Sequence, residues 1–81
     1  MDYNRLKWAA RRGMLELDLI LQPFVENVYP SLDKANQQRF VHLLSCEDQD
    51  LFAWLLHRQE PEDKELAYIV RTIREHTGKP S

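Results

Sequence analysis

The chain has 81 residues with a net charge of −2, and it is 43% hydrophobic and 30% charged. This length predicts one domain over residues 1–81 with a small core, and the composition is typical of a folded protein rather than a disordered one. The slight excess of acidic residues argues against a general nucleic-acid binder. Apolar runs of only a few residues exclude a membrane-spanning segment, which needs about 20, so we expect no membrane insertion.

The N-terminal stretch and the cysteine content bear on cellular location. Four basic residues interrupt the first twelve positions, which therefore lack the apolar core of a secretory signal. Cys46 is the only cysteine, so no internal disulfide can form and a reducing compartment fits. We therefore expect a cytoplasmic protein.

The first apolar residues recur at helical spacing. Tyr3, Leu6 and Ala10 predict a short helix that stops at Gly13. Asp2 stands immediately before this pattern and is a natural N-cap.

A second and clearer apolar stripe follows. Its members recur at alternating steps of three and four residues: Met14, Leu17, Leu21, Phe24 and Val28. Pro23 falls inside the stripe, where a proline removes one helical hydrogen bond and crowds the preceding turn. Because the stripe continues in register beyond Pro23, we predict one kinked helix rather than two separate ones.

Two further helices are expected in the middle of the chain. Pro30 breaks the second helix, and Ser31 is the predicted N-cap of a third. The apolar positions of this third helix are Leu32, Ala35, Phe40, Leu43 and Leu44. Asp48 is the predicted N-cap of a fourth helix, which carries Leu51, Trp54 and Leu55 on one side.

The last segment predicts a fifth helix. Pro61 is expected at its first position, and its apolar face consists of Leu66, Ile69, Val70 and Ile73. Gly78 and Pro80 are expected to end this helix, with a frayed tail after about residue 76. Because no segment has the period of a strand, we predict an all-α fold, a compact bundle of about five short helices.

No group of residues predicts catalysis or metal binding. His42, His57 and His76 lie far apart in sequence and do not have the spacing of metal ligands. Cys46 stands beside an acidic turn, which favours an inert thiol over a nucleophile. The only glycines are Gly13 and Gly78, so the chain has no glycine-rich phosphate loop. The sequence therefore predicts a protein that is not an enzyme.

The segment Arg12-Gly13-Met14-Leu15-Glu16 allows two interpretations. Arginine and glycine are typical of a helix C-terminus, and glutamate suits the first turn of the next helix. Alternatively, the bare backbone at Gly13, between a cation and an anion, forms a contact surface for a partner. Spacing alone leaves both interpretations open.

Two blocks of the sequence resemble the succinate dehydrogenase flavinylation factor family, the small FAD assembly factors of bacteria and mitochondria. The first block contains the motif R-G-x-x-E at residues 12–16, followed by Asp18 and by a stripe that includes Pro23 and Phe24. The second block, residues 47–55, matches an acidic turn that leads into a Leu-x-x-Trp-Leu helix. The likeness covers about residues 3–75, and Gln49 departs from it where relatives often have proline.

The resemblance implies a five-helix assembly factor without catalytic activity. Such proteins bind the flavoprotein subunit of succinate dehydrogenase, and in bacteria often that of fumarate reductase, and promote covalent attachment of FAD to a histidine there. The factor itself is expected to hold no cofactor tightly. The residues carried over are Arg12, Gly13 and Glu16, and the further candidates for partner contact are Trp8, Arg11, Asp18 and Asp50.

The family also implies an alternative role. Members have been interpreted as antitoxin-like partners of a small membrane-associated toxin protein. This chain lacks the basic DNA-binding element common in antitoxins, so DNA binding is not expected.

Overall fold

The computed structural model describes residues 2–77. Within this range the elements are α1 (Tyr3–Ala9), α2 (Leu15–Asn27), the 3₁₀ turn η1 (Tyr29–Ser31), α3 (Lys34–Leu44), α4 (Asp48–Leu55) and α5 (Lys64–Thr77). No strand occurs in these residues. The prediction of an all-helical protein with five helices is therefore confirmed.

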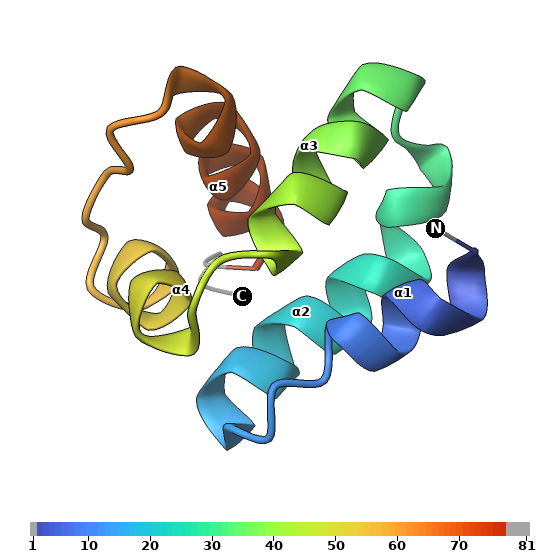
Figure 1. The fold of residues 1–81 in the computed structure, drawn as a ribbon, viewed down its shortest axis with the longest axis horizontal. Helices are drawn as coiled ribbons and strands as arrows, with labels where there is room; N and C mark the ends of the chain where they lie inside the picture. Colours follow the sequence, from blue (N-terminus) through green and yellow to red (C-terminus); the bar gives the residue numbers. More distant parts are fainter. Residues whose placement is uncertain (1, 78–81) are drawn as a thin grey trace.

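The helices surround one apolar core. Figure 1 shows α1 lying beside α2, whereas α3 packs against α5 on the other side of the molecule. α4 contacts both α2 and α5, and α2 also contacts α5. The hydroxyl of Tyr3 donates a hydrogen bond of 3.2 Å to the carbonyl of Val25, which fastens the beginning of α1 to the second half of α2.

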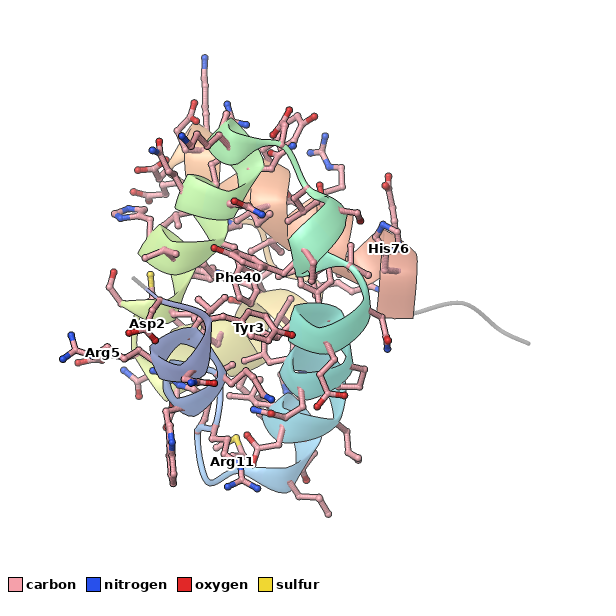
Figure 2. The ribbon with its side chains drawn as sticks, turned by 90° about the vertical axis from the view of Figure 1, so that its right-hand side faces the viewer. Asp2, Tyr3, Arg5, Arg11, Phe40 and His76 are labelled. Carbon is pink, nitrogen blue, oxygen red and sulfur yellow. The ribbon has the colours of Figure 1, made fainter. Side chains whose placement is uncertain are left out.

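The predicted apolar stripes supply all of the buried core except Val25, which lies outside them. Its buried members are Leu6, Ala10, Leu17, Leu21, Phe24, Val25, Phe40, Leu43, Leu44, Leu51, Leu55, Leu66, Ile69, Val70 and Ile73. The rings of Phe24 and Phe40 meet at its centre with 5.2 Å between centroids, and Figure 2 shows Phe40 pointing into the interior. No polar or charged residue is buried in the part of the chain that the structure describes, so the interior is purely apolar.

α2 continues through Pro23, as predicted. The helix runs unbroken from Leu15 to Asn27 with Pro23 inside it, and this proline is exposed. The buried residues before and after Pro23 face the same core. The prediction of one helix is confirmed, and a kink at this residue stays a prediction.

The N-cap of α1 is predicted correctly, and that of α3 is not. The carboxylate of Asp2 accepts a hydrogen bond of 2.8 Å from the Arg5 amide. Ser31 lies in η1 instead of capping α3, and its hydroxyl donates to the Val28 carbonyl. Asp33 caps α3, because its carboxylate accepts a hydrogen bond from the Asn36 amide at 2.8 Å.

Two later helix starts and two apolar positions also differ from the predictions. Tyr3, in the first stripe, is 42% exposed. Asp48 is the first residue of α4, and Glu47 occupies the N-cap position. Pro61 is buried and lies before α5, which begins at Lys64. The carboxylate of Asp63 accepts hydrogen bonds from the amides of Glu65 and Leu66 at the start of this helix. Ala35 is exposed, because it lies in the first turn of α3 away from the core. The predicted stop at Gly78 and Pro80 and the predicted frayed tail lie outside the described residues.

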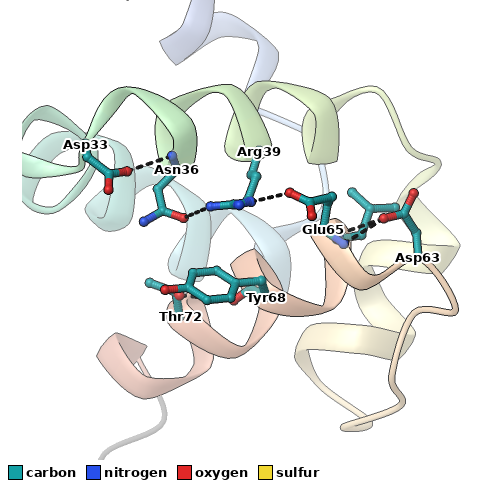
Figure 3. Close-up of polar contacts among 8 residues, drawn as sticks. Asp33, Asn36, Arg39, Asp63, Glu65, Tyr68 and Thr72 are labelled. Atoms are coloured by element: carbon teal, nitrogen blue, oxygen red, sulfur yellow. Dashed lines mark hydrogen bonds and ion pairs between the residues drawn. The ribbon is translucent and has the colours of Figure 1, made fainter.

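A polar network on the surface joins α3 to α5 (Figure 3). The Nε of Arg39 donates to Glu65 at 2.5 Å, and Nη1 donates to the side-chain oxygen of Asn36 at 2.8 Å. The same guanidinium lies 4.8 Å from the centroid of the Tyr68 ring. The hydrogen bond to Glu65 raises the pKa of Arg39. This network therefore links the exposed sides of the two helices.

Candidate functional site

The R-G-x-x-E motif lies where α1 passes into α2. α1 ends at Ala9 and α2 begins at Leu15, so residues 10–14 form the connecting turn. The prediction that the first helix stops at Gly13 is wrong. The helix closes earlier, because the Ala10 amide donates its hydrogen bond to the Leu6 carbonyl. Gly13 instead stands immediately before Met14, the N-cap residue of α2. We call residues 10–14 the motif turn.

Gly13 has a left-handed backbone and open space around it. Its φ is 77°, a conformation that residues with a Cβ adopt at a cost. A Cβ added at this position would meet no atom within 4 Å. The backbone conformation thus explains the glycine, while no internal packing does. The space outside Gly13 is free for another molecule.

The side chain of Arg12 points inward and joins four segments. Its Nε donates to the Asp48 carboxylate at 2.6 Å, and Nη1 donates to the carbonyls of Ala9 and Leu44 at 2.9 Å each. Its Nη2 donates to the carbonyl of Cys46 at 2.9 Å. We call this set of hydrogen bonds the Arg12 clamp. It fastens the motif turn to the end of α3, to the α3–α4 loop and to the start of α4.

The Arg12 clamp uses most of the donors of the guanidinium. Four of its five N–H groups are already engaged, and the side chain is only 16% exposed. Hydrogen bonds that involve a charged group contribute about 1.5–3 kcal/mol each, although contributions from one side chain are not additive. The guanidinium is therefore bound mainly to internal acceptors, and it has only one N–H group left to donate to a partner.

Asp18 also has an internal partner. Its carboxylate accepts a hydrogen bond of 2.8 Å from the backbone amide of Arg12, and the residue is half-buried. This bond satisfies an amide of the motif turn that no helix satisfies. Asp18 and the Arg12 side chain thus hold the motif turn from two sides.

Glu16 and Arg11 point outward. Glu16 is exposed in the first turn of α2, and within residues 2–77 its carboxylate forms no hydrogen bond or ion pair. Arg11 is exposed as well, and its guanidinium lies 5.6 Å from the centroid of the Trp8 ring, which is 71% exposed. Figure 2 shows Arg11 at the end of the molecule where the motif turn lies, directed away from the core. These side chains are available to a partner.

A groove runs between α1 and α2 beside the motif turn. It has a volume of about 390 Å³, and its lining residues are Asn4, Lys7, Trp8, Arg11, Gln22 and Glu26. Its two cations are Lys7 on α1 and Arg11 in the motif turn, and its one carboxylate is Glu26 on α2. The groove joins the aromatic face of Trp8 to positive charge, an arrangement suited to an acidic or amphipathic segment.

The exposure of two leucines, one inside the motif and one just after it, was missed by the sequence predictions. Leu15 is 69% exposed and Leu19 is 66% exposed. Their spacing places them on the same face of α2 as Gln22 in the groove. A signal was present in the sequence, because both leucines fall outside the stripe that contains Leu17 and Leu21. Leucines outside the buried stripe of an amphipathic helix indicate an exposed apolar face.

Asp50 lies on α4, away from the motif turn in sequence but next to the loop that the Arg12 clamp holds. It is exposed in the first turn of that helix.

Burial raises the pKa of the Cys46 thiol, and the negative charge of Asp50 raises it further. Both effects disfavour the thiolate, which is the reactive form of cysteine.

Other kinds of site find no support in the described part of the chain. Among residues 2–77, no three His, Cys, Asp or Glu side chains gather in a way that could hold a metal ion. No helix in that range is both long enough and apolar enough to cross a bilayer. The candidate site remains the surface around the motif turn.

Comparison with known proteins identifies the family to which the chain belongs. Residues 4–77 match the protein family described as Sdh5, flavinator of succinate dehydrogenase. A relative from Pseudomonas aeruginosa is 57% identical over 72 residues, which are 89% of this chain and 86% of the relative. A relative from Shewanella oneidensis is 49% identical over 74 residues, 91% of this chain and 90% of the relative.

A third relative, from Yersinia pseudotuberculosis, is 49% identical over 70 residues, which are 86% of this chain and 80% of the relative. All three relatives carry the name FAD assembly factor SdhE. The match to the family covers nearly the whole described chain and includes the motif turn. The protein therefore belongs to the family of succinate dehydrogenase flavinators, which are assembly factors and not catalytic enzymes.

Proposed function

We propose that this protein binds the flavoprotein subunit of succinate dehydrogenase, and also that of fumarate reductase, and promotes covalent attachment of FAD to a client histidine. The observation that carries the proposal is the exposed surface around Gly13. We define the docking surface as Trp8, Arg11, Gly13, Leu15, Glu16 and Leu19, all of which are exposed. Asp50 extends it toward α4 if the client reaches that far.

The composition of the docking surface supports a protein partner. Leu15 and Leu19 provide apolar area that water would otherwise cover, and Trp8 adds a large aromatic ring. Glu16 and Arg11 provide one negative and one positive group without strong internal partners. Apolar and aromatic anchors surrounded by charges are typical of protein interfaces. Gly13 allows a client backbone to approach the turn closely.

We place FAD in the client rather than in this chain. No polar or charged side chain is buried among residues 2–77, so the interior offers no polar groups to hold a dinucleotide. The reaction joins the flavin 8-methyl carbon to a histidine nitrogen: the methyl C–H and the imidazole N–H each lose a proton, and the two electrons reduce the flavin ring. Flavin and histidine both belong to the client. This protein contributes by holding the mobile parts of the client in the reactive arrangement. Positioning of this kind can lower a barrier by several kcal/mol without any donated catalytic group.

The docking surface is tested by Glu16→Ala, with Glu75→Ala as a matched control. Both glutamates are exposed helix residues, but Glu75 lies on α5, outside the docking surface. An exposed first-turn glutamate contributes about 0.3–1 kcal/mol to stability, so Glu16→Ala should remain folded. Removing one partner of a desolvated charge pair costs about 2–5 kcal/mol of binding, so client flavinylation should fall strongly.

The measurements are melting temperature, client pull-down and in-gel fluorescence of covalently bound flavin. We expect Glu75→Ala to match the unmodified protein in all three. Full flavinylation by a well-folded Glu16→Ala protein would reject the docking surface. If pull-down instead captures a small membrane protein and no flavoprotein, the antitoxin-like alternative replaces the proposal.

Gly13 offers a second test through two substitutions with the same backbone strain. Gly13→Ala and Gly13→Arg both place a Cβ at a φ of 77°, and both should lose about 1–2 kcal/mol of stability. The arginine alone fills the open space outside the turn. We therefore expect similar melting temperatures but much lower flavinylation with Gly13→Arg. Equal flavinylation by the two variants would mean that no client approaches this point.

A further inference from the structure

The Arg12 clamp connects the docking surface to a part of the chain 36 residues away. Asp48 is the only side chain among its acceptors, because the other three are backbone carbonyls. The three carbonyls belong to the backbone and are present whatever side chains those residues carry, so Asp48 is the one acceptor whose chemistry a substitution can change. The pair joins a 16% exposed side chain to a 41% exposed one.

We propose that Asp48 is a positioning residue for client docking, and that it acts through Arg12. Asp48 holds the guanidinium, the guanidinium holds the motif turn, and the motif turn presents Gly13 and Glu16 to the client. The inference rests on the proposed function, since it assumes that the docking surface meets the client there. It assigns a functional role to a residue outside the R-G-x-x-E motif.

The geometry supports an indirect role for Arg12 as well. A planar guanidinium can reach Asp48, Leu44 and Cys46 together, whereas a lysine ammonium is a point charge without this fork. The clamp draws the side chain inward while Glu16 stays outside. If the turn samples other conformations, the apparent affinity for the client equals the intrinsic affinity multiplied by the fraction of molecules in the binding-competent conformation. A turn ordered in one molecule out of about ten would therefore bind about tenfold more weakly.

The key variant is Asp48→Asn, with Glu47→Gln as its matched control. Both substitutions remove one carboxylate at the start of α4, but Glu47 is exposed and does not contact Arg12. The first measurement is amide hydrogen exchange of Arg11 and Arg12 in the free protein, since both amides are hydrogen-bonded in the turn region. We expect about tenfold faster exchange in Asp48→Asn and no change in Glu47→Gln.

The second measurement is affinity for the purified client flavoprotein at a temperature where every variant is folded. We expect Asp48→Asn to bind about tenfold more weakly, and Glu47→Gln to bind like the unmodified chain. Ile69→Val serves as a control for general destabilisation, because it removes one buried methyl group on α5, which contributes no residue to the motif turn or to the Arg12 clamp. This core variant should lower the melting temperature while leaving client affinity unchanged.

A double-mutant cycle separates the indirect role from direct contact. If Arg12 acts through Asp48, then Arg12→Lys and Asp48→Asn should each weaken binding, and the double variant should be no weaker than Arg12→Lys alone. If Arg12 instead contacts the client, Arg12→Lys should bind nearly normally, or the two effects should add. Either of those results would overturn the proposal.

The exchange measurement keeps this inference distinct from the proposed function. Unchanged exchange, or faster exchange with unchanged client affinity, overturns the positioning role even when Glu16→Ala confirms the docking surface. Full flavinylation by Glu16→Ala overturns the docking surface, whatever the exchange rates of the turn are.

Discussion

The carboxylate of Asp18 accepts a hydrogen bond of 2.8 Å from the backbone amide of Arg12, and so closes the motif turn from the α2 side. Asp18→Ala would leave this half-buried amide without an acceptor, which costs about 1–3 kcal/mol. Asp18→Asn keeps an oxygen in reach and should lose less. Urea unfolding of the two variants measures the difference. Equal losses would show that the bond does not depend on the side-chain oxygen.

Ile69 and Trp54 should differ in their contribution to stability. Ile69 is completely buried, so Ile69→Ala should cost about 2–5 kcal/mol of the free energy of unfolding. Trp54 is only half-buried at the rim of the core, and Trp54→Ala should cost about 1–2 kcal/mol. Thermal unfolding followed by circular dichroism measures both changes. A larger loss for Trp54→Ala would mean that the core centre lies nearer to α4.

Acid should weaken the contact between the α4–α5 loop and α5. The hydrogen bond from Arg74 lowers the pKa of Glu60 below its ordinary value of 4.5. A carboxylate whose pKa is lowered by folding stabilises the folded state above that ordinary value, and this stabilisation is lost as the pH falls through the folded pKa. Melting temperatures between about pH 7 and about pH 3 should therefore decline less steeply for Glu60→Gln. Glu62→Gln, a neighbouring exposed glutamate, should retain the normal slope.

Cys46 should react slowly with alkylating reagents in the folded protein. Burial and the charge of Asp50 raise the pKa of its thiol, and only the thiolate reacts. Asp50→Asn removes one of these causes and should increase the rate of alkylation, whereas unfolding in urea should increase it much more. Mass spectrometry after timed exposure to iodoacetamide measures these rates. A folded protein that reacts as fast as the unfolded chain would contradict the burial of the thiol.

The sequence predicts the core well because burial follows helical period. Leu17, Leu21 and Phe24 on α2 lie where their spacing placed them, and so does the face of α5 from Leu66 to Ile73. Helix starts were less predictable, because several neighbouring residues can supply a capping oxygen. Ser31 bonds to the turn behind it, and Asp33 therefore caps α3 instead. Either side chain could cap the helix, and the backbone conformation before α3 determines which of them does.

The candidate site was predictable only in part. The motif identified Gly13 and Glu16, and their exposure agrees with a contact surface. The direction of the Arg12 side chain was not predictable, because its partner Asp48 lies 36 positions away and no periodicity connects them. Tertiary packing brings the end of α3 against the motif turn, and only then do three carbonyls converge on one guanidinium.

The exposure of Trp8 makes tryptophan fluorescence a probe of the docking surface. The chain has only two tryptophans, and Trp8 is 71% exposed beside Arg11, whereas Trp54 is half-buried on α4. In a Trp54→Phe variant, all indole emission would originate at the docking surface. A flavin absorbs light in the range where an indole emits, so the arrival of a flavin-loaded client would quench this emission. The time course of assembly could then be followed in solution without attaching a dye.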